Sequence, residues 1–406
     1  MGRRELIAML SAIMAFTGIG IDVMLPAFDE IRLEFDLGAT STETSRLITV
    51  FFLGLAFGQL FFGPLADRFG RKATLYMGAT VFVGGAIGAA LAPTFGTLLV
   101  ARFIWGIGSA GARVVATSVI RDRFEGAAMA SAMSNIMAVF LLVPVVAPSI
   151  GAGIIAVLPW RSVFWFCALF AIAVVIWSMR LRETLDPANR RELDPRTIIS
   201  GYMQVARTPV TFGYTAAAIF IQAAFVTYVA SIELMVSNIF DRESLFPFVF
   251  GGVGALFGLA ALINGSIVER LGIDTVVNRA LAGISALIGA LIILVAVSSG
   301  TPNFWLFMLI VGLVLSCFMF LMPNLGSAAM LPLGEIAGSG SALTGAVRIA
   351  IGAAIGGYFS EQIDTSVTPF VGTVAVLVAC TAATVWLTRQ GGVRGLLRSG
   401  AGRPDL

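Results

Sequence analysis

Long apolar runs, separated by short polar breaks, repeat along almost the whole chain. Each run covers about 20 residues, which is enough to cross roughly 30 Å of hydrocarbon as an α-helix with a rise of 1.5 Å per residue. The pattern predicts an all-α polytopic membrane protein with about twelve transmembrane helices. The expected spans are residues 6–27, 45–66, 74–93, 97–118, 128–156, 161–181, 209–235, 246–268, 278–299, 303–323, 338–359 and 367–388.

One long polar segment, RLRETLDPANRRELDPR at residues 180–196, divides these runs into two sets of six. It mixes both charges with two prolines, which is typical of a linker. We therefore expect an N-terminal six-helix bundle over residues 1–181, a cytoplasmic linker over 182–206, a C-terminal six-helix bundle over 207–390 and a cytoplasmic tail over 391–406.

The composition agrees with a membrane protein, because 58% of the residues are hydrophobic and only 12% are charged. A soluble domain carries roughly 25% charged residues. Most of the 26 lysines and arginines fall in loops and tails on the side of the N-terminus. We expect the chain to lie in the inner (plasma) membrane of the cell. The positive-inside rule then places both termini in the cytoplasm. This asymmetry accounts for the net charge of +3, so we expect no nucleic-acid partner.

The sequence lacks the residues that several classes of function require. The chain has no histidine, and its three cysteines all lie in predicted spans, where packing is their expected role. We expect no metal site, no catalytic residues and no enzyme activity, because no nucleophile–base pair or phosphate-binding Gly-Lys-Ser/Thr loop is present. Proton chemistry would have to use carboxylates, with protons as coupling ion and no other cofactor.

A short charged motif occurs twice. GPLADRFG at residues 63–70 returns as GSIVERLG at residues 265–272, almost half the chain later. An internal repeat of this kind indicates two similar six-helix units. The residues that recur at identical spacing are Gly63, Asp67, Arg68 and Gly70, matched by Gly265, Glu269, Arg270 and Gly272.

Each residue of the first copy has a physical role in this loop. Gly63 and Pro64 would allow a close helix approach and Gly70 a tight turn. Asp67 can pair with a neighbouring arginine or face a helix N-terminus. One interpretation is a purely topogenic loop, but the repeat favours a conformational latch that also includes Arg68 and Arg71. We expect Arg71→Ala to slow transport less than Asp67→Asn does.

The extended loop GPLADRFGRK, residues 63–72, closely resembles the loop motif of the major facilitator superfamily. Three further stretches are similar to its drug:proton antiporter group, particularly the bicyclomycin and chloramphenicol resistance branch. These are GIDVMLPAFDEI (20–31), LLVARFIWGIGSAG (98–111) and VPVVAPSIGAG (143–153). The resemblance implies the major facilitator fold, two pseudo-symmetric six-helix bundles, and an antiporter motif at Pro144, Pro148 and Gly151. The chain departs from the pattern where Ala147 precedes Pro148 and where Thr117 stands near the usual position of an arginine.

Ionisable residues inside the membrane are costly, about 2.5–3.5 kcal/mol each at mid-depth, and therefore indicate function. Asp22 is the one acid in the first six predicted spans. By helical rise, Arg102 reaches about the same depth. We expect the two to meet as a proton-coupling pair, in which Arg102 stabilises the charged form of Asp22. Glu233, late in the seventh span, is expected to be an interfacial acid and is the next candidate.

The substrate cavity is expected to be lined by polar and aromatic positions of three spans. Arg102, Gly106, Ser109 and Arg113 lie within about a 60° arc of one helix. For Arg113, snorkelling to the inner interface is the alternative. Arg348 lies near the middle of the eleventh span with no acid nearby in sequence. Core packing is the alternative for the aromatic residues. The full set is Ser109, Arg113, Gln222, Phe225, Tyr228 and Arg348.

Together these features predict a monomeric secondary transporter that exports lipophilic or cationic drug-like compounds in exchange for protons by alternating access. Its partners would be the small-molecule substrate, protons and the lipid bilayer. A proton-coupled symporter or facilitator for a small anionic or polar metabolite is the alternative, because intramembrane arginines could bind an anion. A scaffold or receptor is disfavoured because the sequence has no sizeable soluble domain.

Overall fold

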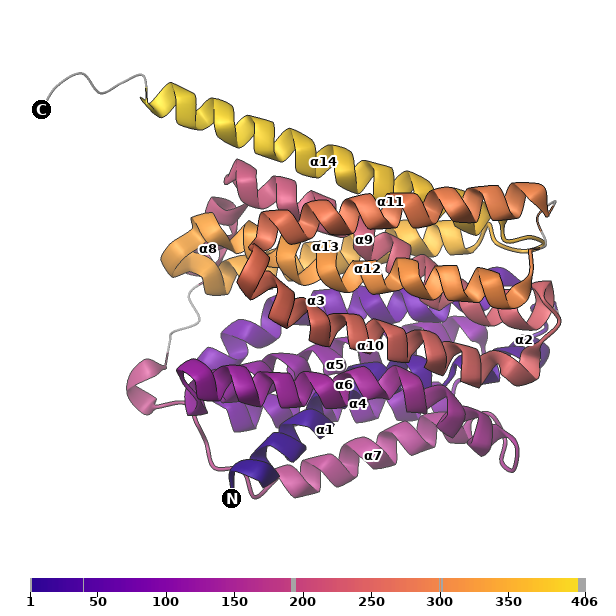
Figure 1. Cartoon of the computed structure of the whole chain (residues 1–406). Coiled ribbons are helices and arrows are strands. Elements are labelled where there is room, and N and C mark those ends of the chain that lie inside the picture. The colour runs from indigo at the N-terminus through magenta and orange to yellow at the C-terminus, as the bar shows by residue number, and fades with distance from the viewer. Residues whose placement is uncertain (1, 39, 191–194, 299, 301, 401–406) are drawn as a thin grey trace, which may run out of the picture.

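The computed structural model describes residues 2–38, 40–190, 195–298, 300 and 302–400 (Figure 1). Within these residues all regular structure is helical. Eleven helices are long and apolar enough to cross a membrane, and the seventeen-residue helix α7 (Ser162–Ser178) is apolar as well. The expected all-α polytopic fold is therefore confirmed. Parts of the expected linker and tail, residues 191–194 and 401–406, lie outside the described residues.

The helices follow the predicted spans closely. The N-terminal half contains α1 (Arg3–Asp22), α2 (Phe28–Glu34), α3 (Arg46–Phe69), α4 (Arg71–Ala90), α5 (Phe95–Arg123), α6 (Gly126–Ile155) and α7. The C-terminal half contains α9 (Pro209–Leu234), α10 (Phe246–Leu271), α11 (Ile273–Val297), α12 (Phe304–Met330), α13 (Ala337–Ser360) and α14 (Thr368–Gly400). Short helical turns cover Leu25–Ala27, Thr42–Ser45, Pro187–Asn189, Met235–Ile239, Glu243–Leu245 and Leu331–Ile336.

Two helices were not expected, namely the short α2 and a helix in the linker. The linker folds into α8 (Pro195–Ala206), and the hydroxyl of Tyr202 donates a 3.2 Å hydrogen bond to the carbonyl of Leu60 in α3. With twelve residues and several polar side chains, α8 falls below the length that marks a spanning helix. Helix α8 also packs against α13 and α9, so the linker contacts both halves.

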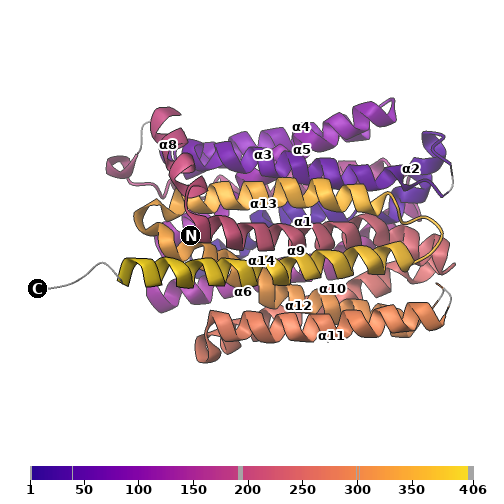
Figure 2. The same ribbon diagram turned by 90° about the horizontal axis from the view of Figure 1, so that it is seen from above.

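The helices run side by side along one direction, as the two perpendicular views show (Figures 1 and 2). The start of α1 and helix α8 lie at one end of the molecule, which we call the proximal end. Helix α2 lies at the opposite, distal end. Because successive spanning helices alternate in direction, α1, α4, α9 and α13 start at the proximal end, and α3, α5 and α10 start at the distal end.

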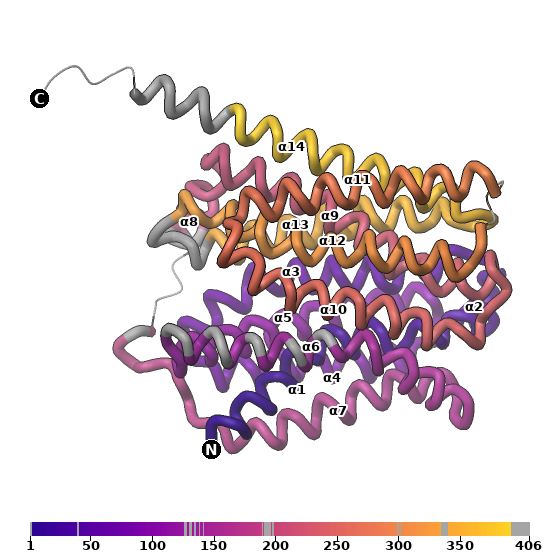
Figure 3. The backbone as a smooth tube through the Cα atoms, viewed as in Figure 1, coloured from indigo at the N-terminus to yellow at the C-terminus, as the bar shows by residue number. Residues whose placement is uncertain are grey.

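The two halves meet along two pairs of helices. Helix α3 packs against α13, and α6 packs against α10, so the second and fifth spans contact the eleventh and eighth. These contacts can be followed along the backbone in Figure 3. The equivalent arrangement of both pairs agrees with two pseudo-symmetric bundles. It also means that side chains on α3, α5, α9 and α13 can contribute to one central region.

Glycines bring α5 close to its neighbours. A Cβ atom added to Gly54 of α3 would clash with the backbone of Phe103, and one added to Gly106 of α5 would clash with the backbone of Phe51. Small residues of this kind let membrane helices approach closely. Trp105, fully buried between them, packs edge-on against Phe51, Phe82 and Phe164. This packing fixes the rotation of α5 and therefore the direction of its two arginines.

Candidate functional site

A cluster of charges joins three helices at the proximal end. Arg71, only 3% exposed, lies at the start of α4. Its Nη1 is 2.7 Å from Asp67 Oδ1 of α3, and its Nε is 2.8 Å from Asp122 Oδ2 of α5. Asp67 therefore pairs with a neighbouring arginine, as one of its two expected roles requires. Because Arg71 bridges two acids, it is the central member of the cluster.

The linker contributes a further acid to this end. The Glu183 carboxylate accepts the backbone N–H groups of Arg71 and Lys72 at 2.9 and 3.1 Å, and also those of Thr184 and Leu185. Partial burial alone would raise the pKa of Glu183, but these four donors outweigh it and lower the pKa below its ordinary value. Glu183 thus satisfies the free N-terminal groups of α4. The sequence analysis missed both Glu183 and Asp122, which are distant from the motif in sequence.

Two members of the predicted latch behave differently. Arg68 is exposed and lies over the ring of Phe69, outside the ion-pair cluster. The expected close helix approach at Gly63 is wrong, because a Cβ added there would meet no atom within 4 Å. The turn at Gly70 is confirmed by its φ of +96°, a conformation that favours glycine.

Asp22 is the last residue of α1, where the helix gives way to a short turn. Its side chain is 6% exposed, and no described residue forms a hydrogen bond or ion pair with its carboxylate. Across the interface between the halves, it lies within electrostatic range of Tyr228 on α9. The hydroxyl of Tyr228 is buried and also has no partner among the described residues. The interface between the halves therefore holds a buried carboxyl group and a phenol that have no hydrogen-bond partner among the described residues.

The expected ion pair between Asp22 and Arg102 is wrong for this conformation. Arg102 Nη1 instead donates a 2.7 Å hydrogen bond to the carbonyl of Gly20, and Nε donates to the carbonyl of Leu47 at 3.3 Å. Because α1 ends at Asp22, the carbonyl of Gly20 is free to accept, and a cation at a helix C-terminus is favourable. The guanidinium also lies over the rings of Phe51 and Trp105, 4.5 and 4.8 Å from their centroids.

The predicted cavity residues lie at different places. Arg348 of α13 donates to the amide oxygen of Gln222 on α9, so the structure brings these two together. Arg113 lies within electrostatic range of Arg348 and has no described hydrogen-bond or ion-pair partner for its side chain. Ser109 is fully buried and donates to the carbonyl of Trp105 in its own helix.

The aromatic cavity residues stack on α10. The ring of Phe225 stacks on Phe257 with centroids 5.7 Å apart, and the ring of Tyr228 stacks on Phe250 at 6.1 Å. Phe225 keeps accessible surface, whereas the side chain of Tyr228 is 3% exposed. These stacks fix both rings on the face of α9 that points toward α10.

The antiporter motif of α6 lies where three helices meet. A Cβ added to Gly151 would clash with the carbonyl of Val23, just after α1. One added to Gly254 of α10 would be 3.3 Å from Cβ of Pro144. Pro148 is buried within α6, one turn before Gly151. The motif therefore combines the contact of α6 with the end of α1 and its contact with the other half.

The distal end is closed by two ion pairs between the halves. Arg32 Nη2 of α2 is 2.6 Å from Glu233 Oε2 of α9, and Arg32 also pairs with Asp29. The Arg32 and Glu233 side chains are 1% and 4% exposed. Arg46 Nε of α3 is 2.8 Å from Glu361 Oε1, which follows α13. Neither pair could be predicted from the sequence, since their members are 201 and 315 residues apart.

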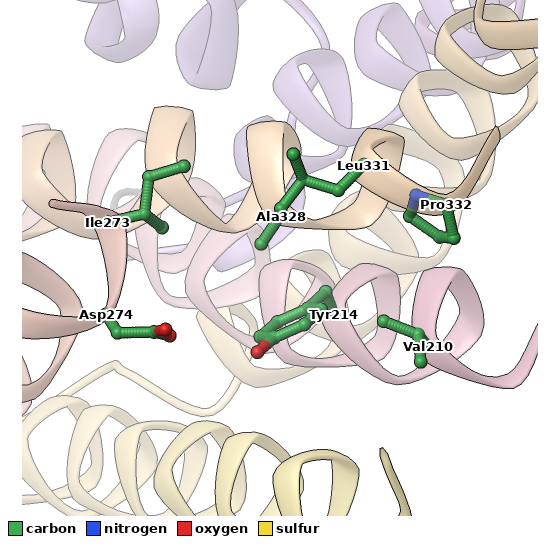
Figure 4. A pocket seen from close by; sticks show the side chains of 7 residues that line it. All are labelled: Val210, Tyr214, Ile273, Asp274, Ala328, Leu331 and Pro332. Atoms are coloured by element: carbon green, nitrogen blue, oxygen red, sulfur yellow. The ribbon is translucent and has the colours of Figure 1, made fainter. Parts of the chain in front are cut away.

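A pocket of about 380 Å³ opens at the proximal ends of α9, α11 and α12 (Figure 4). Its lining residues are Val210, Tyr214, Ile273, Asp274, Ala328, Leu331 and Pro332. Figure 4 shows Tyr214 and Asp274 directed toward each other across it. Asp274 is already paired with Arg389 at 2.7 Å. None of these residues is among the predicted cavity residues, so the pocket is separate from the predicted cavity.

Comparison with known proteins agrees with these observations. Residues 9–356 match the family model described as Major Facilitator Superfamily. A bicyclomycin resistance protein homolog of Haemophilus influenzae is 29% identical over 353 residues, covering 86% of this chain and 87% of that protein. The multidrug resistance protein MdtL of Escherichia coli is 33% identical over 170 residues, 42% of this chain and 43% of that protein. These relatives confirm the resemblance to the drug:proton antiporter branch.

The same fold occurs in a solved structure of a D-xylose–proton symporter, with a TM-score of 0.77 at 13% identity. The match covers 94% of this chain and 96% of that one. The family is one of transporters and not an enzyme class. With twelve apolar helices among its described residues and a family match over residues 9–356, this multi-pass membrane protein belongs to the Major Facilitator Superfamily.

Proposed function

We propose that the protein exports small lipophilic, drug-like compounds in exchange for protons. The observation that carries this proposal is Asp22, a buried carboxyl group without a partner at the interface between the halves. A proton-coupled cycle needs an acid that binds a proton in one conformation and releases it in another. Asp22 meets this need, because no ion pair fixes its charge. The names of the relatives in bacteria support a drug-like cargo.

In this proposal the proximal end faces the cytoplasm, with both termini and the 182–206 linker on that side, as the basic residues favour. The protein acts as a monomer, in which residues 1–181 and residues 207–390 rock against each other as two units. The Arg32–Glu233 and Arg46–Glu361 pairs hold the distal, outer end closed. Opening this end has to break both pairs, since their members belong to opposite halves.

Arg102 acts on Asp22 indirectly. By holding the carbonyl of Gly20, it fixes the end of α1 and therefore the position of the carboxyl group two residues later. The cluster around Arg71 serves as the conformational latch, because it ties α3, α4 and α5 together at the proximal end. Neither role requires contact with the substrate.

A symporter for an anionic metabolite is the second candidate function, and one observation favours a negatively charged substrate. Arg113 and Arg348 lie within electrostatic range of each other, and neither has an acidic partner among the described residues. Two positive charges disfavour a cation in the same region. We therefore retain the lipophilic part of the expected cargo and not the cationic part.

Reconstituted liposomes test the proposed function. A pH gradient should drive accumulation of chloramphenicol or 2-naphthoate, whereas the cation ethidium should not accumulate. Asp22→Asn should lose gradient-driven accumulation at least tenfold and keep exchange of labelled for unlabelled compound, because an amide cannot carry a proton. Asp36→Asn, an exposed acid at the distal end, is the matched control. Full gradient-driven accumulation by Asp22→Asn would assign coupling to another acid.

A further inference from the structure

Three helices carry a polar side chain at one depth. Gln59 of α3 lies ten residues from the proximal end of its helix, Arg113 of α5 also ten, and Arg348 of α13 eleven. At 1.5 Å per residue these positions are about 15–17 Å from the proximal ends. Asp22 is nineteen residues from the proximal end of α1, about 28 Å, and so belongs to a different layer.

The packing brings these three positions together. Helix α3 contacts both α5 and α13, and therefore lies between the two arginine-bearing helices. A Cβ added to Gly345 would be 2.6 Å from Nε2 of Gln59, and Gly345 is three residues before Arg348 on α13. Arg113 and Arg348 lie within electrostatic range of each other, although they belong to opposite halves.

This layer has positive charge without a counter-charge. Arg348 donates to the neutral amide of Gln222, and the side chain of Arg113 has no described partner. The amide oxygen of Gln59 is buried and unpartnered as well. Helix α13 contains no acid, and the acids of α3 and α5, Asp67 and Asp122, are already held by Arg71 near the proximal end.

Buried arginines are normally compensated, because each costs several kcal/mol in a membrane and two like charges repel. Snorkelling would have to reach along about 15 Å of helix, because that length separates both residues from the proximal ends of α5 and α13. Both arginines retain accessible surface although they lie in mid-helix among other helices. The uncompensated charge and the accessible guanidinium groups leave a place for a negatively charged group.

We propose that Arg113 and Arg348 together bind the carboxylate group of an organic anion, which is the cargo class of this transporter. The proposal rests on the transport function proposed above. Guanidinium groups match a carboxylate through paired N–H···O bonds. The side-chain amides of Gln59 and Gln222 add further donors at the same site. The apolar part of the compound would contact Phe225, one turn from Gln222 on α9.

Calorimetric titration of the purified protein tests this site. The probes are benzoate, 2-naphthoate and 4-phenylbenzoate, each compared with its neutral carboxamide. At least one carboxylate should bind tenfold or more tightly than its carboxamide. Arg113→Gln and Arg348→Gln should each reduce this preference to less than threefold. Arg121→Gln, an exposed arginine on α5 with no described partner, should leave it unchanged.

Equal affinity for all three carboxylates and their carboxamides would overturn the proposal, as would a preference that survives both glutamine substitutions. If the glutamine variants do not fold, Arg113→Lys and Arg348→Lys replace them. Loss of the paired geometry should lower the preference at least threefold, and an unchanged preference in both would also contradict the site. The measurement uses neither membrane nor gradient, so failure of proton-coupled export would leave its result intact.

Discussion

The two ion pairs at the distal end allow a direct test of how burial controls the opening of the transporter. Glu233→Gln removes the charge that joins Arg32 to the C-terminal half. Glu361→Gln removes the equivalent charge from Arg46. Both changes preserve side-chain shape and affect the same interface between the halves. They differ in exposure, because the first pair is 1% and 4% exposed and the second 43% and 31%.

The expected magnitudes differ accordingly. Breaking a buried ion pair by removing one partner costs about 3–5 kcal/mol. Because Asp29 still holds Arg32 in the variant, we take the lower value of about 3 kcal/mol. At 1.4 kcal/mol per factor of ten, Glu233→Gln should favour the distal-open form about 150-fold. An exposed pair contributes at most about 1 kcal/mol, so Glu361→Gln should shift the population no more than about fivefold.

Distances between spin labels report this equilibrium. The three cysteines are replaced, and labels are attached at Thr40 and Ser244, which are exposed near the distal end in opposite halves. Glu233→Gln should increase the longer-distance population strongly, and Glu361→Gln only slightly. The double variant Arg32→Gln, Glu233→Gln should return part of the way to wild type, because no buried charge is left unpaired. Equal responses to the two single substitutions would refute the reasoning from burial.

Three further predictions concern the proximal end. Arg71→Ala should slow transport more than Asp67→Asn, because Arg71 also holds Asp122. This order is the reverse of the one expected from the sequence. Initial transport rates, with substrate binding measured in parallel, decide between the two orders. Gly70→Ala should destabilise the protein by about 1–3 kcal/mol, since an alanine at a φ of +96° is strained. Gly63→Ala should leave stability unchanged or raise it slightly. Equal thermal unfolding of the two variants would contradict this prediction. Because the pKa of Glu183 is lowered in the folded protein, its stabilising effect should be present above pH 4.5 and be lost as pH falls below that value. The stability difference between wild type and Glu183→Gln should therefore shrink on acidification, and a constant difference from pH 7 to 3 would count against it.

The number and limits of the spanning helices could be predicted because a membrane imposes a length and an apolar composition on each of them. Helix α8 escaped this criterion, since it is short and partly polar. Depth along a helix was also predictable, and Arg102 does reach the end of α1. The direction of its side chain was not, because the free carbonyl of Gly20 exists only where α1 ends. The Arg32–Glu233 pair left no trace in the sequence for a similar reason, since its members meet only after the two halves assemble.

The repeated motif shows which part of a sequence symmetry survives in three dimensions. Gly70 and Gly272 both precede a helix, α4 and α11, with φ values of +96° and +76°. The turn is therefore preserved in both halves, because it depends on one residue that needs no partner. The ion pairs are not preserved. In the first copy the acid pairs with Arg71, but the second copy has Ile273 at that position, and Arg389 of α14 pairs instead with Asp274. A latch made of side chains from several helices can thus change in one half while the backbone of both halves remains alike. For this reason the ion-pair cluster around Arg71 makes the proximal end of the N-terminal half different from its counterpart.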